Sequence, residues 1–273
     1  MPEHTPPAPA DKGPVVVFKD VSLTFDRDPV LKNISFTVEH GQTLVILGPA
    51  GTGKSVLLKL VDGLIKPDSG SIHVFGEDIA AMRERDIFKL RKRIGMVFQE
   101  SALFDSMNVE DNVAYRLNEE GMAQAESHAK VDEVLKFVEL PTAAAKFPAE
   151  LSGGMRRRVS IARAIITAPD LILYDSPTGG LDPITSTTIV ELVVKQRDVS
   201  HTTSLLITHR LQDAFVLATH RFNPDANKME PIPDGGVDDT TRFLVLNEGS
   251  IVFNGTTEDL VHSEDPWIKE YLS

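Results

Sequence analysis

A glycine-rich loop between a buried strand and a helix restricts the fold of this chain more than any other feature. Thr43–Leu47 (TLVIL) is a short, mostly apolar run that suits a strand buried on both faces of a sheet. The loop Gly48–Ser55 (GPAGTGKS) follows, and Ser55–Leu64 is predicted to be a helix. A strand, a loop and a helix in this order indicate an α/β fold, in which helices cover a largely parallel sheet.

The loop fits the pattern G-x-x-x-x-G-K-[ST], which predicts a binding site for nucleotide phosphates. Glycine lets backbone N–H groups approach phosphate oxygens, and the following helix adds its positive N-terminal end. Lys54 is expected to reach the β- and γ-phosphates of ATP, and Ser55 is expected to bind Mg²⁺. A chance glycine turn is disfavoured because the required strand and helix flank the loop. The residues predicted to contact the nucleotide here are Gly48, Pro49, Ala50, Gly51, Thr52, Gly53, Lys54, Ser55 and Val56.

The other apolar runs extend this arrangement. Leu171–Tyr174 (LILY) and Ser204–Thr208 (SLLIT) are predicted to be further buried strands. Residues from about 100 to 166 have mostly helical periodicity. Residues from about 221 to 241 are polar and contain Pro and Gly, so they are interpreted as an exposed, inserted loop. Strands are also predicted at Val15–Phe18, Val21–Phe25, Ile34–Val38, Ser71–Phe75, Ile94–Phe98, Phe243–Leu246 and Ile251–Phe253.

Composition limits what else the chain can do. The 273 residues carry a formal net charge of −12 and include no cysteine, so disulfides are excluded and a general nucleic-acid binder is disfavoured. The basic run at 89–93 (KLRKR) is interpreted as a solvated helix face. No apolar stretch approaches the ~20 residues that span a bilayer, so a role at a membrane requires another chain. Residues 1–14, rich in proline, are predicted to be a disordered leader.

Two further patterns add chemistry. Asp175 directly follows the predicted strand LILY, where an acid can bind the metal of a phosphate site, although a strand-ending Asp also caps turns. Ser152, Gly153 and Gly154 precede a predicted helix, and a hydroxyl with unobstructed N–H groups at a helix start can bind an anion. Taken alone, this triplet is more simply an N-cap.

In this order, the motifs resemble those of the nucleotide-binding subunit of ABC transporters, over nearly the whole chain after the leader. The resemblance implies a P-loop NTPase (RecA-like) core, an N-terminal antiparallel β subdomain and a helical subdomain at about 100–166, within an ABC ATPase domain at 15–273. It also implies an ATPase with ATP and Mg²⁺ as cofactors. Phe25 is similar to the aromatic residue that stacks on adenine, and Asp175 to the acid that binds Mg²⁺ together with Ser55.

Other motif residues have roles in catalysis and dimerisation in that family. Gln99 is similar to the glutamine that senses Mg²⁺, the attacking water and the membrane partner. His209 is similar to the switch histidine that contacts the γ-phosphate, although a lone His after an apolar strand is usually a turn residue. Ser152–Gly154 resembles the signature motif, which covers the γ-phosphate bound by the opposite subunit. The loop GLD, which ends at Asp182, resembles the dimer-facing loop.

Ser176 departs from the family pattern, which has Glu directly after the metal-side acid to polarise the attacking water. A serine hydroxyl can orient water but is not a base near neutral pH, and general-base assistance contributes about 10²–10⁴ in rate. Two interpretations stay open. In the first, Ser176 acts in catalysis with Gln99 and His209, because phosphoryl transfer depends mainly on positioning and electrostatics. In the second, the site hydrolyses ATP poorly and the subunit is an ATP-dependent regulatory switch.

Residues 98–115 (FQESALFDSMNVEDNVAY) resemble the phospholipid-transport branch of the family, the Mla type, as do residues 183–185 (PIT) and 265–267 (DPW). The resemblance implies a peripheral subunit on the cytoplasmic face of the inner (plasma) membrane. Such a subunit forms an ATP-dependent homodimer and energises an integral-membrane permease, without binding nucleic acid. The alternatives are a subunit of another ABC importer or exporter, or a soluble ABC ATPase that acts on DNA or ribosomes.

Overall fold

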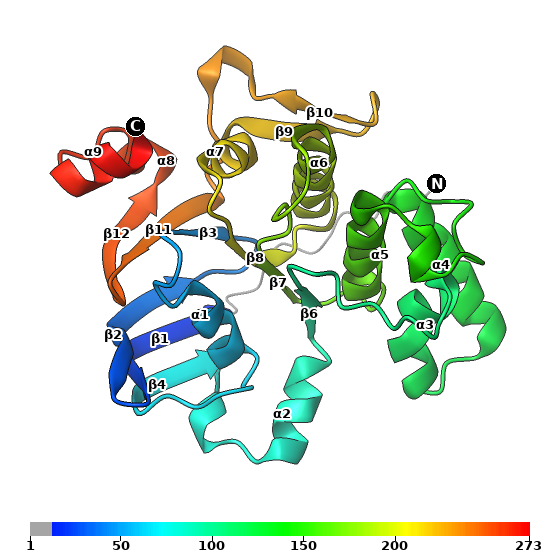
Figure 1. The fold of residues 1–273 in the computed structure, drawn as a ribbon, viewed down its shortest axis with the longest axis horizontal. Helices are drawn as coiled ribbons and strands as arrows, with labels where there is room; N and C mark the ends of the chain where they lie inside the picture. Colours follow the sequence, from blue (N-terminus) through cyan, green and yellow to red (C-terminus); the bar gives the residue numbers. More distant parts are fainter. Residues whose placement is uncertain (1–12) are drawn as a thin grey trace.

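A six-stranded sheet in the centre of the molecule contains the strand that leads into the glycine-rich loop (Figure 1). The computed structural model describes residues 13–273, and the strand order is β12-β11-β3-β8-β7-β6. Neighbouring strands are parallel except β12, which is antiparallel to β11. The predicted parallel core is therefore confirmed. The bounds are β3 Thr43–Leu47, β6 Ile94–Val97, β7 Leu171–Asp175, β8 Thr203–Ile207, β11 Thr241–Asn247 and β12 Ser250–Thr256.

The central strands are apolar throughout because both faces of the sheet are covered. Successive residues of a strand point to opposite faces, so each strand contributes to two cores. Along β3, Leu44 and Ile46 lie in the core shared with α1 and an antiparallel sheet, whereas Val45 and Leu47 lie in the core shared with α5, α6 and α7. The bounds of these helices are α1 Lys54–Val61, α5 Gly153–Ile165, α6 Pro183–Ser200 and α7 Leu211–Thr219.

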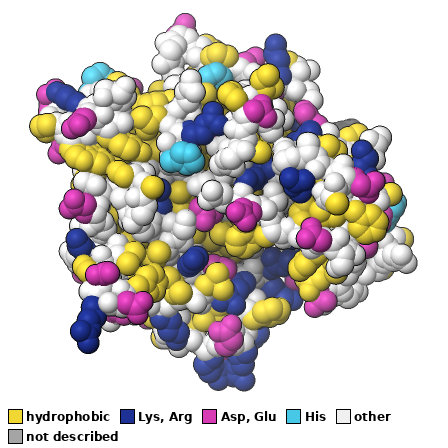
Figure 2. Space-filling view, viewed as in Figure 1, with side chains coloured by type: hydrophobic (Ala, Val, Ile, Leu, Met, Phe, Trp, Pro, Cys, Tyr) yellow, Lys and Arg dark blue, Asp and Glu magenta, His cyan; other side chains and the backbone are white. Residues whose placement is uncertain are grey.

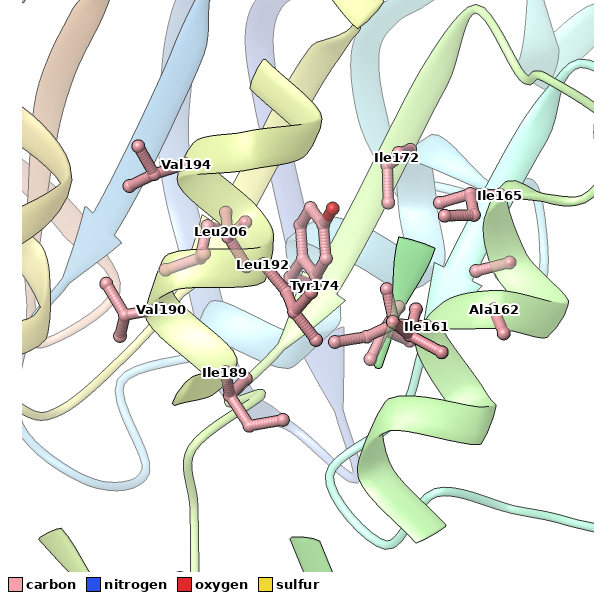
Figure 3. Close-up of a cluster of buried hydrophobic side chains, with 14 of the residues drawn as sticks. Ile161, Ala162, Ile165, Ile172, Tyr174, Ile189, Val190, Leu192, Val194 and Leu206 are labelled. Atoms are coloured by element: carbon pink, nitrogen blue, oxygen red, sulfur yellow. The ribbon is translucent and has the colours of Figure 1, made fainter. Parts of the chain in front are cut away.

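Helix α5, which begins with the signature motif, packs on the sheet through the core that contains Val45 and Leu47. Figure 3 shows Tyr174 of β7 between Ile161 of α5 and Leu192 of α6. The Tyr174 side chain is fully buried, and burial raises the pKa of its phenol. Because large side chains from three elements interdigitate here, a shift of α5 must repack this core or be carried to its neighbours.

The N-terminal strands form a separate antiparallel sheet, in the order β2-β1-β4-β5. The two strands predicted at Val15–Phe18 and Val21–Phe25 form a single strand, β1. They were predicted separately because a bulge at Asp20, which has a positive φ of 51°, interrupts the alternation of apolar and polar residues. The leader predicted at 1–14 lies outside the described residues except for its last two positions. The bounds are β1 Val16–Phe25, β2 Asp28–Val38, β4 Ser69–Val74 and β5 Glu77–Asp78.

Helices α3 and α4 pack against α5 on the side of the molecule away from the antiparallel sheet (Figure 1). Asn108 caps α3 by accepting a 2.8 Å hydrogen bond from the backbone N–H of Asp111, and Ser152 caps α5 in the same way through Met155 at 3.2 Å. These helices fall within the helical subdomain predicted at about 100–166, whose boundaries stay a prediction. The bounds here are α3 Val109–Glu119, α4 Gln124–Phe137 and the 3₁₀ turn Pro148–Glu150.

The segment at about 221–241 is not the simple exposed loop that was predicted. It begins with a hairpin of β9 His220–Asn223 and β10 Lys228–Pro231, which packs on α6. The side chain of Asp198, on α6, accepts a 2.7 Å hydrogen bond from the N–H of Phe222. The prediction was wrong because this contact joins residues that are distant in sequence, which local polarity does not reveal.

The remaining elements connect these parts and end the chain. No helix within residues 13–273 has both the length and the apolar character that crossing a membrane requires. The bounds are 3₁₀ turns Ile79–Ala81 and Pro233–Gly235, and helices α2 Glu84–Arg91, α8 Thr257–Val261 and α9 Pro266–Leu272.

Candidate nucleotide-binding site

The glycine-rich loop lies at the C-terminal end of β3, against the backbone of two other strands. Gly48 has φ 142°, and a Cβ at this position would overlap the carbonyl oxygen of Leu246 on β11. Gly53 has φ 92°, and a Cβ there would lie 3.0 Å from the carbonyl oxygen of Val30 on β2. Both positions therefore require glycine for conformation and for space. Glycine at these two positions lets the loop pack closely against β11 and β2.

Lys54 lies folded over this loop. Its ammonium donates hydrogen bonds to the carbonyl oxygens of Gly48, at 2.9 Å, and Pro49, at 2.6 Å. Burial lowers the pKa of Lys54, and the nearby carboxylate of Asp175 partly opposes this. A partly desolvated cation beside open backbone N–H groups attracts anions more strongly than a solvated one. The arrangement suits phosphate oxygens.

Ser55 and Asp175 are brought together as predicted, although they are 120 residues apart. The hydroxyl of Ser55 donates to Oδ1 of Asp175 over 3.0 Å, from the first turn of α1 to the end of β7. These are hard oxygen donors, which Mg²⁺ prefers, and Mg²⁺ usually takes its other ligands from phosphates and water. Within residues 13–273 there is no group of three or more His, Cys, Asp or Glu side chains that could enclose a metal by itself. The pair therefore fits a magnesium ion that binds together with ATP.

Ser176 directly follows Asp175 and begins a turn against which Gln99 lies. Ser176 is 8% exposed and has φ 49°; its N–H donates to Ile207 at 3.0 Å, and its carbonyl accepts from Gly179 at 2.9 Å. A Cβ at Gly179 would lie 3.5 Å from Nε2 of Gln99, so this amide lies against the turn that Ser176 begins. Two of the three predicted catalytic residues thus lie at the same turn, Ser176 within it and Gln99 against Gly179.

Phe25 and His209 lie at the margins of the site. Phe25 is 45% exposed at the turn between β1 and β2, the hairpin whose Val30 borders the loop. His209 is exposed and follows β8, the strand between β3 and β7. Both side chains are exposed, and their roles at the nucleotide stay predictions.

The signature motif and Asp182 form a separate surface. A Cβ at Gly154 would overlap the methyl group of Thr185, so the start of α5 packs directly on the start of α6. Asp182 caps α6 by accepting a 3.0 Å hydrogen bond from the N–H of Thr185, and the Thr185 hydroxyl bonds the same carboxylate and lowers its pKa. Helices α5 and α1 lie on different sides of the central sheet (Figure 1). Ser152, which is exposed, is therefore not brought to the phosphate loop of its own chain.

Tyr271 is a site residue that was not predicted. Its hydroxyl oxygen accepts a 3.0 Å hydrogen bond from the N–H of Gly48, and its ring stacks on Trp267 with centroids 5.2 Å apart. Helix α9 thus fixes the first residue of the loop. The contact spans 223 residues, and no motif marks it.

The sequence comparisons agree with this geometry. A family model described as ABC transporter matches residues 31–179, more than half of the chain. The chain belongs to the ABC transporter family. This ABC protein is 37% identical over 259 residues to the intermembrane phospholipid transport system ATP-binding protein MlaF of Escherichia coli K12, covering 94% of this chain and 88% of MlaF. It is 34% identical to the chloroplastic protein TRIGALACTOSYLDIACYLGLYCEROL 3 of Arabidopsis thaliana, covering 96% and 74%.

Solved structures give the same result. The dimeric ATP-binding cassette MJ0796, in a post-hydrolysis state bound to ADP and Pi, superposes on this ABC protein with a TM-score of 0.74. The two are 28% identical, and the alignment covers 88% of this chain and 98% of the other. The predicted family and the P-loop NTPase fold are confirmed, and the chain is an ATP-binding subunit of an ABC transporter.

Proposed function

We propose that this ABC ATPase hydrolyses ATP to energise a permease that moves phospholipid. The observation that carries the proposal is the Ser55–Asp175 pair beside Lys54, which supplies metal-binding oxygens and a cation at one end of the sheet. The name of MlaF and the extent of its similarity, over 88% of its length, support phospholipid as the transported class.

In the proposed reaction, Lys54 and the loop N–H groups bind the β- and γ-phosphates. Ser55 and Asp175, with Gln99, would hold Mg²⁺, which supplies charge neutralisation for the phosphates. Water attacks the γ-phosphorus in line, a new P–O bond forms and the bond to the β-phosphate oxygen breaks, so ADP leaves with inorganic phosphate, and the proton that the water loses passes to the phosphate or to solvent. Ser176 and Gln99 orient the water, and His209 donates a hydrogen bond to the γ-phosphate.

A second copy of the chain completes each site. The signature surface at Ser152–Gly154 faces away from its own loop, and a hydroxyl with free N–H groups at the start of α5 suits the γ-phosphate of a partner. The dimeric state of MJ0796 supports this arrangement. The exposed side chain of Ile184, 83% accessible beside Asp182, gives this surface an apolar contact for the partner.

A membrane permease is the proposed partner at the segment 98–115, and the subunit would then lie at the cytoplasmic face of the membrane. Three aromatic side chains there are more than a third exposed, and two of them, Phe104 and Tyr115, pack with centroids 4.8 Å apart. Exposed aromatic clusters are typical of protein interfaces. The three are Phe98, Phe104 and Tyr115.

Purification of the tagged chain from detergent-solubilised membranes tests this function. The expected result is co-purification of an integral-membrane protein with bound phospholipid, and ATP hydrolysis by the complex. A Lys54→Ala control should retain the membrane protein and lose hydrolysis. A complex that carries no phospholipid, or whose ATPase rate ignores added phospholipid, would contradict the proposed substrate.

A further inference from the structure

Arg157 lies one turn after the signature motif and contacts two other motifs. Its guanidinium donates from Nη1 to the carbonyl oxygen of Phe98 at 2.6 Å and from Nη2 to the carbonyl oxygen of Gln99. Nη2 also donates to the carbonyl oxygen of Gly179 at 3.3 Å. One side chain of α5 therefore bonds the backbone of the glutamine loop and the turn that follows Ser176.

A second arginine of α5 holds the rest of the same loop. Arg163 donates to the carbonyl oxygens of Ala102, at 2.8 Å, and Ser101, at 3.1 Å. Ser101 and Ala102 both have positive φ, 63° and 47°, which is unfavourable for residues other than glycine. The loop therefore keeps this shape through its contacts with α5 and not through local preference.

The charge of Arg157 is unusual for its surroundings. The side chain belongs to a residue that is 4% exposed, and within residues 13–273 it forms no ion pair within 4.0 Å. Burial lowers its pKa, and the more distant carboxylates of Asp175 and Glu100 partly oppose this. A buried cation with only carbonyl partners is costly, so a neutral side chain would suffice if filling space were its only role.

We propose that Arg157 is a positioning residue, which sets the Gln99 amide against the Ser176 turn and transmits movements of the signature helix to it. The inference rests on the proposed hydrolysis of ATP. When the signature docks on the partner's nucleotide, α5 moves as a rigid helix, and the Arg157 bonds carry Gln99 and Gly179 with it. Ser176 has no carboxylate to hold the attacking water. The placement of Gln99 therefore contributes more to the hydrolysis rate here than in a family member with Glu at this position.

The neighbouring Arg158 provides a matched control. It lies on the same helix, but its guanidinium donates at 3.5 and 3.3 Å to the carbonyl oxygens of Val138 and Glu139, in the helical region. Arg157→Gln and Arg158→Gln each remove one positive charge from adjacent positions of α5. Only the first change removes the bonds of α5 to the carbonyl oxygens of Phe98, Gln99 and Gly179, while the Arg163 bonds to the loop remain in both variants.

The test combines steady-state kinetics, equilibrium binding of ATP and hydrogen exchange over residues 98–102. For Arg157→Gln we expect kcat to fall about tenfold to a hundredfold, because misplacement of catalytic groups by about 1 Å costs that much. KM and ATP affinity should stay within about twofold of wild type, and exchange at 98–102 should become faster. Arg158→Gln should match wild type in all three measurements.

Unchanged kcat and exchange in folded Arg157→Gln would overturn the proposal. So would a loss of ATP binding that parallels the loss of rate, because Arg157 would then only support the fold. If Arg157→Gln does not fold, Arg157→Lys replaces it; this variant keeps the charge but not the forked donors, and kcat should still fall with affinity retained. A wild-type chain without ATPase activity would contradict the proposed function. Hydrogen exchange at 98–102 in Arg157→Gln and wild type would still test whether Arg157 holds the glutamine loop.

Discussion

Ser176 has a backbone that is fixed independently of its side chain. Its φ of 49° is held by hydrogen bonds of its N–H to β8 and of its carbonyl to Gly179. The turn should therefore keep its shape when the Ser176 side chain is changed. Asp175, the preceding residue, should then stay in place. A substitution at this position tests the chemistry of the side chain alone.

Ser176→Glu should raise the ATP hydrolysis rate by about tenfold or more, because a positioned base contributes about 10²–10⁴. Phosphate release at saturating ATP measures the effect. Ser176→Gln, of equal length but without a charge, should stay near the wild-type rate. Equal rates for the Glu variant and wild type would show that positioning by Gln99 and His209 already suffices.

Residues that belong to motifs could be placed from the sequence, and residues that only touch the motifs could not. The Ser55–Asp175 contact follows from the fold of the motif, because the ends of parallel strands meet at one edge of the sheet. Tyr271 and Arg157 reach the site across 223 and 58 residues, through contacts that exist only after packing. No local pattern distinguishes them from other aromatic or basic residues.

The basic run at 89–93 also makes a contact between two helices that the local sequence pattern did not reveal. Figure 2 shows Lys and Arg side chains gathered along the lower edge of this view, where Figure 1 places α2. The prediction of a solvated face holds for Lys89, whose side chain is 79% exposed. It is wrong for Arg91, which is 25% exposed and donates a 2.9 Å hydrogen bond to the carbonyl oxygen of Asp62 at the end of α1.

Asp62 connects α1 to α2 and α3, and its ionisation should affect stability. Burial raises its pKa to about 6, and the cations Arg91 and Arg116 only partly oppose this. Since the folded state binds the proton more tightly than the unfolded state, this group's contribution is greatest below about pH 4 and is lost as pH rises through 6.

Asp62→Asn should remove that pH dependence. Between pH 4 and pH 7, the stability of wild type should fall relative to the variant by about 1–3 kcal/mol, from a pKa displacement of about two units. Denaturant unfolding of both proteins over this pH range measures the difference. The opposite trend, with wild type gaining on the variant as pH rises, would show that the pairing with arginine outweighs burial.

The β9–β10 hairpin depends on one buried arginine of α6. Arg197 is 5% exposed, pairs with Asp198 at 2.6 Å and Asp238 at 3.1 Å, and donates to the carbonyl oxygen of His220 at 2.8 Å. Its partners lie up to 44 residues away along the chain. Sequence polarity identified the segment as surface, but it did not reveal this attachment.

Arg197→Met should therefore destabilise the protein by about 3–5 kcal/mol, because it removes a buried arginine and leaves two half-buried carboxylates and the carbonyl oxygen of His220 without their partner. Chemical denaturation measures the loss, and limited proteolysis should show faster cleavage near the hairpin tip at 224–227. As a control, Arg221→Gln breaks a pair with Glu230 on an arginine side chain that is 52% exposed, and it should cost less than about 1 kcal/mol. Similar losses in both variants would contradict this account of the hairpin.

The whole molecule has the phosphate loop and the signature motif, the two halves of the proposed nucleotide site, in separate places. The loop with Lys54 lies at the end of β3, and the signature with Ser152 begins α5 on another side of the sheet (Figure 1). The order of motifs was sufficient to predict this fold, because the phosphate loop, Gln99, Asp175 and His209 each lie at or just after the end of a strand of the central sheet. The signature motif also predicted that two chains join, but the sequence did not show how the two surfaces would meet.

A mixture of two inactive variants tests whether two chains together complete one nucleotide site. Lys54→Ala removes the cation of the loop, and Ser152→Arg blocks the signature, so neither variant alone should form ATP-dependent dimers or hydrolyse ATP. A mixed dimer has one site with an intact loop from the second variant and an intact signature from the first. Mixing should restore ATP-dependent dimers and a substantial fraction of the wild-type ATP hydrolysis rate. A mixture that is as inactive as each variant alone would show that the two chains do not complete a shared site.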